Sequence, residues 1–343
     1  MIGDHGPYAA TIHTVDGELL GDLALSQVVS TKWSRELNEV SRGTVVSTDA
    51  VDIAEHVTPW QHWITLWDGR DPVWSGPILK TTDDGRNLTV DARDVGCLLS
   101  RTRTTASQVW AGQGPQRIAA DLWNQMLRLH RVNATPDVYP MPTVDRFDYN
   151  TSTDSTLLSQ NMSDLVKLGL QWTIIAGRPV LGTVADDPVA ELADCDFLED
   201  TQLVRDGTRT ANDVMVQGQN YAHTYVAPLG GLRLQALVSI DDLFGVSNIK
   251  RATRQYTELS GVIRQQIIVP SSVTLHQDAE VSLGDLIPGA LFIVHSRGMS
   301  QIMRLVKVEV ANESGSNKVA VSLETIQTTT ELGEKTTGTE VAL

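Results

Sequence analysis

A dense run of short, tryptophan-rich strand patterns constrains the fold of this chain more than any other feature. Between Val57 and Asp94, stretches of aromatic and β-branched residues alternate with turn residues. An Asp-Gly turn separates the stretches 62–67 and 73–78, and a second Asp-Gly turn leads into 88–92, where apolar and polar residues alternate. The sequence therefore predicts a β-meander in this part of the chain.

Strand patterns also fill the remainder of the first and last parts of the chain. Besides the meander, we expect strands within residues 1–105 at 9–13, 23–25, 33–40 and 44–47. After residue 201, we expect strands at 202–204, 213–218, 262–269, 291–295, 304–310 and 319–323, with a turn at 205–208 between the first two and a hairpin made by the last two. Residues 326–343 lack any periodicity and predict a flexible or extended tail.

The middle of the chain has helical periodicity. A helix that begins at Pro115 presents one apolar face, made by Ile118, Leu122, Met126 and Leu129. Asp154 is expected to cap a second helix that ends at Gly169 and carries the apolar residues Leu157, Leu158, Met162, Leu165 and Val166. A strand hairpin, 170–175 with 180–182, follows. We therefore predict a small α/β domain over residues 106–200.

These patterns define a fold class. A chain of 343 residues exceeds the usual size of one hydrophobic core, so two or three domains are expected. We predict a mainly β protein with an α/β part, in which two tube-forming, barrel-like β domains (1–105 and 201–325) flank the small α/β domain. The tail of residues 326–343 completes this division.

Motifs of known catalytic sites are absent from the sequence. The eight histidines form no His-Glu-x-x-His motif, and there is no Gly-x-Ser-x-Gly elbow, phosphate-binding loop or calcium loop. His56 and His62 flank Trp60, and this pair is a candidate for metal ligation. The acid pairs Asp186-Asp187 and Asp241-Asp242 could act as glycosidase carboxylates, although 42 acidic residues make such pairs expected by chance. We therefore expect no catalytic residue, no cofactor, no metal site and no enzymatic activity.

Cysteine usage and charge exclude further classes. Cys97 and Cys195 lie far apart without a Cys-x-x-Cys partner, so we expect two small buried or half-buried thiols. The net charge of −15 argues against clamping of a nucleic-acid backbone, which needs clustered Lys and Arg. Residues 106–200 are the most acidic part for their length, with 13 acidic and 6 basic residues. The N-terminus lacks a basic and apolar leader, so we expect a soluble protein without a Sec signal or a membrane span.

The tryptophans of the meander allow two interpretations. Trp60, Trp63, Trp67 and Trp74 could line a sugar-binding groove, because aromatic faces stack on pyranose rings. Aromatic residues at such density more often pack barrel walls or a subunit interface. We favour packing or an interface for this set.

Several stretches of turn and strand residues, over roughly residues 20–325, together carry a resemblance to a known family. In the first part of the chain these stretches are Trp33 to Gly43, Thr58 to Trp60, Leu66 to Gly69, Val73 to Ile78, Ala92 to Asp94, Leu98-Leu99 and Arg101. In the last part they are Asp206 to Thr208, Asn212 to Gly218, Leu286 to Gly289 and Arg304 to Val308. Together they resemble the minor tail proteins of siphophages that infect actinobacteria. These proteins in turn resemble the baseplate-hub family of phage tails and type VI secretion spikes.

The resemblance implies a structural role. Hub proteins of this family form trimers at the distal end of the tail tube, where they contact other tail-tip proteins, the tube and the tape measure protein, and take part in tail assembly and DNA ejection. It implies synthesis in the host cytoplasm, a place at the tail tip of the virion, and DNA that passes without specific binding along a lumen faced by some acids. The two β regions could supply equivalent tube segments. A spike-type component of a contractile secretion system and a glycan-binding or glycan-hydrolysing tail protein are the alternatives.

Overall fold

Strands dominate the chain and helices are few. The computed structural model describes residues 8–23, 27–48, 51–142, 144–268, 274–296, 299–313, 316–326 and 339–341. Strands account for 45% of the chain and helices for 18%. The predicted class, mainly β with an α/β part, is confirmed.

The first β region contains the predicted meander. Its strands are β1 (Ala9–Thr14), β2 (Leu19–Leu23), β3 (Val28–Glu36), β4 (Arg42–Thr48), β5 (His62–Asp68), β6 (Asp71–Asp83) and β7 (Asn87–Arg93). In β7 the predicted alternation is confirmed, because Leu88, Val90 and Ala92 are all buried. The expected strand 33–40 is wrong beyond Glu36, and residues 24–25 of another expected strand lie outside the described residues.

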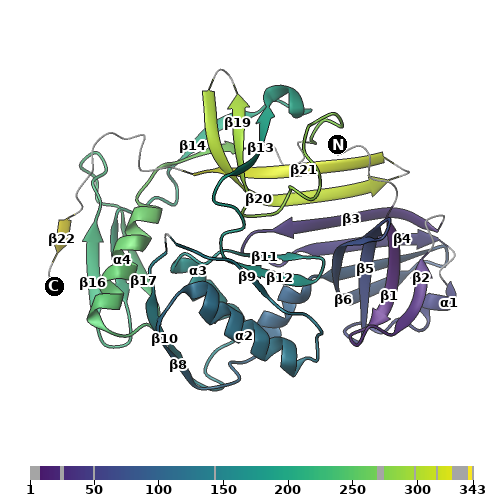
Figure 1. The fold of residues 1–343 in the computed structure, drawn as a ribbon, viewed down its shortest axis with the longest axis horizontal. Coiled ribbons are helices and arrows are strands. Elements are labelled where there is room, and N and C mark those ends of the chain that lie inside the picture. The colour runs from purple at the N-terminus through teal and green to yellow at the C-terminus, as the bar shows by residue number, and fades with distance from the viewer. Residues whose placement is uncertain are drawn as a thin grey trace.

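The long strand β6 changes partners along its length. Its first half pairs with β5, and from Ile78 onward it pairs with β7, with register shifts in both ladders. β1, β2 and β5 consequently cross the direction of β3 and β4 (Figure 1). At the change of partner, a Cβ on Gly76 would lie 1.8 Å from the carbonyl oxygen of Arg93. Only glycine permits this close approach of two backbones.

The second β region is built around one long hairpin. It comprises β13 (Pro188–Ala193), β14 (Gln202–Asp206), β18 (Arg264–Ile268), β19 (Leu291–Ser296), β20 (Met299–Glu313) and β21 (Ser316–Thr325). The predicted hairpin of 304–310 with 319–323 is confirmed as β20 and β21. The turn expected at 205–208 lies slightly later, at 207–210, where the N–H of Thr210 donates to the carbonyl oxygen of Gly207 at 3.1 Å. The strands on either side of this turn do not pair with each other, because β14 pairs antiparallel with β18.

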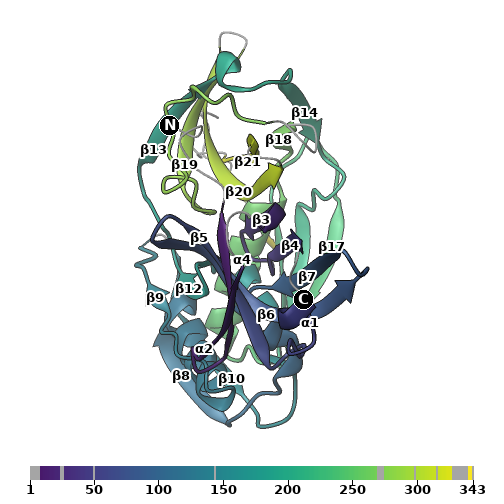
Figure 2. The same cartoon turned by 90° about the vertical axis from the view of Figure 1, so that its right-hand side faces the viewer.

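One sheet runs through both β regions. Residues 299–304 of β20 pair with β19, and residues 307–313 of the same strand pair with β3. Eleven strands of the described chain thus share a sheet, which the described pairings leave open at both ends. Figure 2 shows β19, β20 and β21 curving above β3 and β4.

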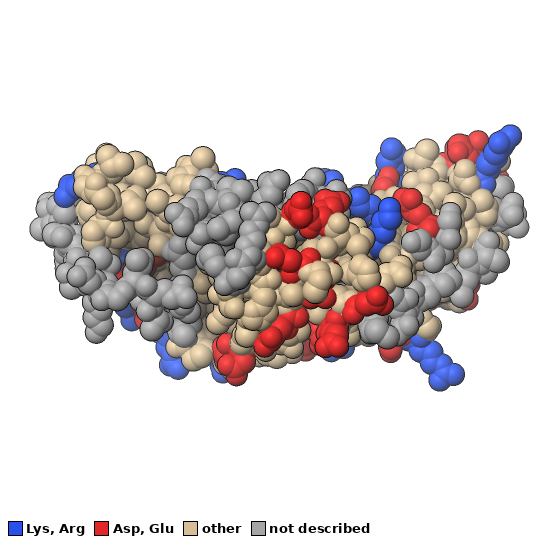
Figure 3. All heavy atoms as spheres, turned by 90° about the horizontal axis from the view of Figure 1, so that it is seen from above, with Lys and Arg blue, Asp and Glu red and all other residues tan. Residues whose placement is uncertain are grey.

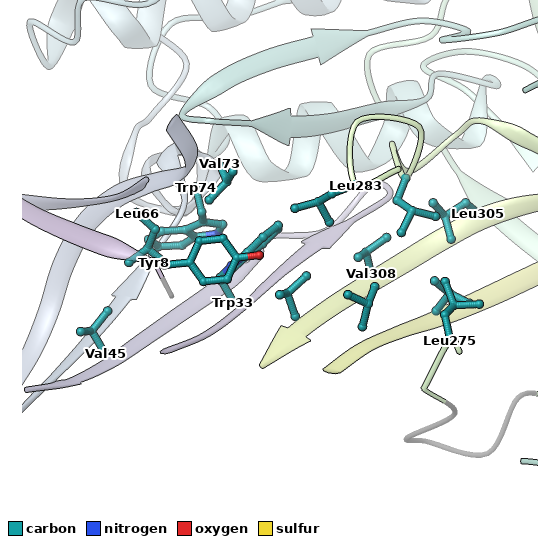
Figure 4. Packing of buried hydrophobic residues seen from close by; sticks show 14 of the residues in the cluster. Tyr8, Trp33, Val45, Leu66, Val73, Trp74, Leu275, Leu283, Leu305 and Val308 are labelled. Atoms are coloured by element: carbon teal, nitrogen blue, oxygen red, sulfur yellow. The ribbon is translucent and has the colours of Figure 1, made fainter. Parts of the chain in front are cut away.

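A single core lies inside this sheet. Tyr8 and Trp33 meet edge to face with ring centroids 6.1 Å apart, and Trp74 packs beside them (Figure 4). Val308 and Leu305 of β20 continue the core towards the second region (Figure 4). The core therefore joins the start of the chain to residues near 310.

The α/β part lies below this sheet in Figure 1. It contains the 3₁₀ helix η2 (Val95–Arg101), β8 (Gln108–Gln113), α2 (Pro115–Leu129), β9 (Asp137–Val138), β10 (Phe147–Thr151), α3 (Leu158–Lys167), β11 (Trp172–Ile175) and β12 (Arg178–Leu181). Both predicted helices and the predicted hairpin are confirmed. The hairpin turn has positive φ at Ala176 (49°) and Gly177 (79°), as a tight two-residue turn requires.

Two details of these helices differ from the prediction. Leu129 was expected on the buried face of α2, but it is 59% exposed because it is the last residue of the helix, beyond the core. Asp154 was expected to cap α3. Instead Leu157 occupies the N-cap position, and Asp154, with φ 58°, forms an ion pair with Arg103 at 3.2 Å.

A small sheet and a helix follow β14. They are β15 (Asp213–Gln217), β16 (Ala222–Val226), β17 (Gln235–Ser239) and α4 (Val246–Ser260), and β22 (Thr339–Val341) pairs with β16. The sequence pattern does not predict α4, because the buried face of this helix is largely polar, with Asn248, Thr253 and Thr257 beside Ile249 and Ala252. Within the predicted tail, residues 339–341 form β22, and residues 327–338 and 342–343 lie outside the described residues, so the flexible or extended tail stays a prediction.

Pairing and packing cross the predicted domain boundaries. β13, in the range 106–200, is parallel to β19 of the second β region. Val214 and Ile249, in the range 201–325, share a core with α2 and α3. The division into 1–105, 106–200, 201–325 and 326–343 stays a prediction.

Candidate functional site

A groove of about 450 Å³ lies where the first β region meets the end of α2. Its walls combine aromatic, charged and aliphatic side chains, among them Trp60, Trp63, Pro77, Leu98, Arg101 and His130. They come from the loop before β5, from β5 and β6, from η2 and from the residue after α2. We regard it as the candidate functional site.

Trp60 is held in a conformation that large residues rarely adopt. Its φ is 69°, and its N–H donates a hydrogen bond of 2.8 Å to the carbonyl oxygen of Ile78 in β6. Positive φ in a bulky residue costs about 1–3 kcal/mol, and such strain concentrates at functional positions. The indole is nevertheless 43% exposed, so burial of the ring does little to offset this strain.

Arg101 faces the Trp60 ring. Its guanidinium carbon lies 5.8 Å from the ring centroid, within cation–π distance. Arg101 is the last residue of η2, whose first turn is capped by Asp94 accepting from the backbone N–H of Gly96. Asp94 also accepts from the backbone and hydroxyl of Ser41, and burial raises the pKa of its carboxyl to about 6. A buried polar link thus fixes the helix that presents Arg101.

His130 brings a second segment to the groove. Its Nε2 lies 2.8 Å from the hydroxyl of Thr102, and partial burial lowers the pKa of the imidazole. The contact places Arg101 and Arg131, both exposed, on segments that touch. The groove therefore offers an indole face, aliphatic walls and nearby cationic groups. Such a surface suits an apolar side chain accompanied by carboxylates.

The other tryptophans of the meander have packing roles. Trp63 and Trp74 are buried, and the Trp74 indole N–H donates to the hydroxyl of Ser41 at 3.2 Å. The indole N–H of Trp67 donates to Thr11 at 2.9 Å. Of the four, Trp60 presents the most accessible ring.

The histidines and the acid pairs weighed from the sequence lie in different surroundings. His62 Nδ1 accepts from the backbone N–H of Thr58 at 2.8 Å. Asp242 accepts from Asn161 at 3.3 Å, and burial, with Asp164 nearby, raises the pKa of its carboxyl to about 6. Asp186 and its neighbour are exposed before β13. Across the described residues, no cluster of three or more His, Cys, Asp or Glu side chains is arranged to hold a metal ion.

The thiols differ from each other. Cys97 is buried in η2, and burial raises its pKa to about 12. Cys195 was expected to be buried or half-buried and is exposed, because it lies in the short helix η3 (Asp194–Asp196) at the surface. Within the described ranges, each helix is too short or too polar to span a membrane.

Comparison with known proteins identifies the fold. No model of a known protein family matches the sequence, and no curated protein matches it. The tail protein from Neisseria meningitidis MC58 superposes with a TM-score of 0.63 at 14% identity, covering 92% of this chain and 96% of that one. The chain has a phage tail protein fold.

Two further solved structures agree. The 43 kDa tail protein of prophage MuSo2 from Shewanella oneidensis gives a TM-score of 0.59 at 11% identity, covering 92% of this chain and 97% of that one. The prophage tail protein gp18 from Listeria monocytogenes EGD-e gives 0.57 at 11% identity, covering 91% and 94%. The phage tail protein fold thus extends over nearly the whole length of each chain.

The sequence singles out some of the residues that line the groove, but it does not predict that they form one. Trp60 and Trp63 were singled out as aromatic residues, and Arg101 belonged to the resemblance. Val15 and Val132, which also line it, were missed. No local signal could have placed these residues together, since the pairing of β1 with β5, the core shared by α2 and η2, and the contact of Thr102 with His130 bring them into one place.

Proposed function

We propose that this chain is a structural protein of a phage tail tip, a tail hub that forms a trimeric ring or cap at the distal end of the tail tube. The observation that carries the proposal is the phage tail protein fold, which covers about nine tenths of the chain and nearly all of three tail proteins. A fold alone does not determine a function. The proposal therefore also rests on the similarity extending over nearly the whole length of the three tail proteins, and on the absence of catalytic motifs from the sequence.

The finer parts of the proposal rest on the sequence resemblance. The chain is a siphophage minor tail protein of a phage that infects actinobacteria. It acts without enzymatic activity in tail assembly and DNA ejection, and it contacts the tail tube, the tape measure protein and other tail-tip proteins. The acidic composition supports passage of DNA without adhesion, because like charges repel the polyanion. Its location is the tail tip of the virion, after synthesis in the host cytoplasm.

Deletion of the gene from the phage genome tests the role. The expected lysate contains filled heads, and its tails are either missing or blunt at the distal end. Infectivity returns when the chain is supplied in trans. Tails of normal length and morphology with undiminished infectivity would contradict the proposal.

An activity assay tests the non-enzymatic part separately. The purified chain is expected to release no soluble fragments from actinobacterial peptidoglycan. Turnover that is lost in Asp242→Asn but kept in the exposed control Asp186→Asn would instead favour the glycan-hydrolysing alternative.

A further inference from the structure

The groove beside Trp60 is flanked by cationic groups in a strongly acidic protein. Arg101 closes over the indole, and Arg131 lies between the lining residues His130 and Val132. Among the described residues, neither arginine has an ion pair with an acidic side chain. The turn after Val15 also carries acids, so the two arginines, and not the whole rim, are the expected contacts of an anionic partner.

The chain also carries an acidic surface segment with an exposed apolar side chain, which complements the cationic and apolar groove. Seven acids and no Lys or Arg lie between Arg178 and Arg205. Within this stretch, Leu198 is 58% exposed and is followed by the exposed Glu199 and Asp200. The face above β13 and β19 shows acidic side chains gathered at its centre (Figure 3). An exposed leucine alone is ordinary, but a leucine beside two carboxylates matches the groove in both character and charge.

The leucine is presented by ordered backbone. Phe197 is buried and forms a bridge with Leu275, and the N–H of Leu198 donates to the carbonyl oxygen of Thr274 at 2.9 Å. The hydroxyl of Thr201 donates to Asp194 at 3.0 Å across the turn. A segment held in this way loses little conformational entropy on binding.

A chain cannot insert this segment into its own groove. α2, which leads into His130, lies at the bottom of the molecule, and β13, which leads into the acidic segment, lies at the top in both views (Figure 1, Figure 2). Two different, complementary surfaces on one chain can form a heterologous contact, which closes into a ring when the rotation between neighbouring copies permits it.

We propose that the groove binds the 198–200 segment of a second copy of this chain. Leu198 enters the groove against Trp60, and the carboxylates of Glu199 and Asp200 face Arg101 and Arg131. The contact deepens the trimeric hub proposed above and rests on it. It also assigns a role to the strained backbone of Trp60, which sets the ring that receives the leucine.

A charge exchange tests the contact in the whole chain by sedimentation velocity over a concentration series. Arg101→Glu with Arg131→Glu, and separately Glu199→Arg with Asp200→Arg, are each expected to weaken self-association at least about tenfold, because like charges then oppose each other. A single chain that carries all four changes pairs a reversed groove with a reversed segment at every contact of the ring, and it should associate as tightly as the wild type. Arg70→Glu with Arg86→Glu, at exposed turns remote from the groove, makes the same charge change and should have no effect.

A second readout locates the contact directly. A photoreactive phenylalanine analogue replaces Leu198 in one isotope-labelled population, which is mixed with unlabelled wild-type chain. The expected intermolecular crosslink joins position 198 to a peptide containing Trp60, Arg101 or His130.

The outcomes separate the two proposals. A wild-type trimer that neither variant pair weakens, or crosslinks that map elsewhere, would overturn the contact and leave the hub intact. A wild-type chain that stays monomeric at its highest soluble concentration, or that forms dimers, would overturn the contact and count against the trimeric hub.

Discussion

Gly76 lies where β6 turns from β5 to β7, and replacing it with alanine tests the account of this bend. In Gly76→Ala the new Cβ would lie 1.8 Å from the carbonyl oxygen of Arg93 and 2.8 Å from the Cα of Asp94. Ordinary contact begins near 3.4 Å, so the two backbones must separate by the difference, about 1.6 Å. Neither contact atom belongs to a flexible side chain that could rotate away.

This displacement would disturb two features that position the groove. The ladder of β6 with β7 begins two residues later at Ile78, and Asp94 caps the helix that carries Arg101. Overpacking costs about 1–3 kcal/mol where side chains can adjust, and a clash between backbones exceeds that range. We expect Gly76→Ala to lower the free energy of unfolding by about 3–5 kcal/mol, or Tm by roughly 10 °C.

Urea unfolding followed by tryptophan fluorescence measures this loss. Gly207→Ala is the matched control, because a Cβ there meets its nearest atoms at 3.8 and 3.9 Å. That control should leave the free energy of unfolding unchanged or raise it by about 0.4–1 kcal/mol through the unfolded chain. A Gly76→Ala variant within about 1 kcal/mol of wild type would refute the close approach of β6 to Arg93.

Two further predictions concern the link to η2 and the strained indole. The pKa of Asp94 is raised to about 6 in the folded state, so folding favours the protonated carboxyl. The stabilisation of the fold by this group is complete below the unfolded pKa of 3.8 and is lost as the pH rises through about 6. The contribution of Asp94 to this loss is about 3 kcal/mol. Asp242, whose pKa is also raised to about 6, loses stabilisation over the same pH range in every variant. Urea titrations at pH 4 and pH 7 should therefore show the same loss in wild type and in the exposed control Asp16→Asn, and a loss smaller by about 3 kcal/mol in Asp94→Asn. At Trp60, where φ is 69°, the free energy of unfolding of Trp60→Gly should exceed that of Trp60→Ala by about 1 kcal/mol, because glycine adopts positive φ without strain. A more stable Trp60→Ala would contradict the strain.

The sequence predicts best where local pattern and packing agree. The meander of β5, β6 and β7 was predicted because each strand carries aromatic or alternating residues between Asp-Gly turns. The helices α2 and α3 were predicted because their apolar residues repeat at helical spacing. In these elements the residues that fix the local structure also form the core.

The prediction failed where polar residues are buried. α4 buries Thr253 and Thr257, whose hydroxyls donate to backbone carbonyls one turn earlier at 2.7 Å. These bonds satisfy polar groups that periodicity analysis assigns to solvent, so the helical pattern was hidden. The partner of β14 was equally hidden, because β18 follows it only after the whole small sheet and α4.

The candidate site was beyond sequence reasoning for a different reason. The sequence draws attention to Trp60 and Arg101 but does not connect them with each other or with His130, because the groove forms only where β6, η2 and the end of α2 come together. The positive φ of Trp60 has no signature in the sequence, since large residues avoid that conformation. Long-range pairing therefore creates the groove that receives the 198–200 segment in the proposed contact.

The central claim is that this chain is a threefold tail hub, and a cryo-electron microscopy reconstruction of the tail tip of the phage that encodes it tests this most directly. The account predicts three copies of the chain around the tail axis at the distal end of the tube, with the 198–200 segment of each copy in the groove of the next. A ring of two or six whole chains, or a tail tip without this chain, would contradict it.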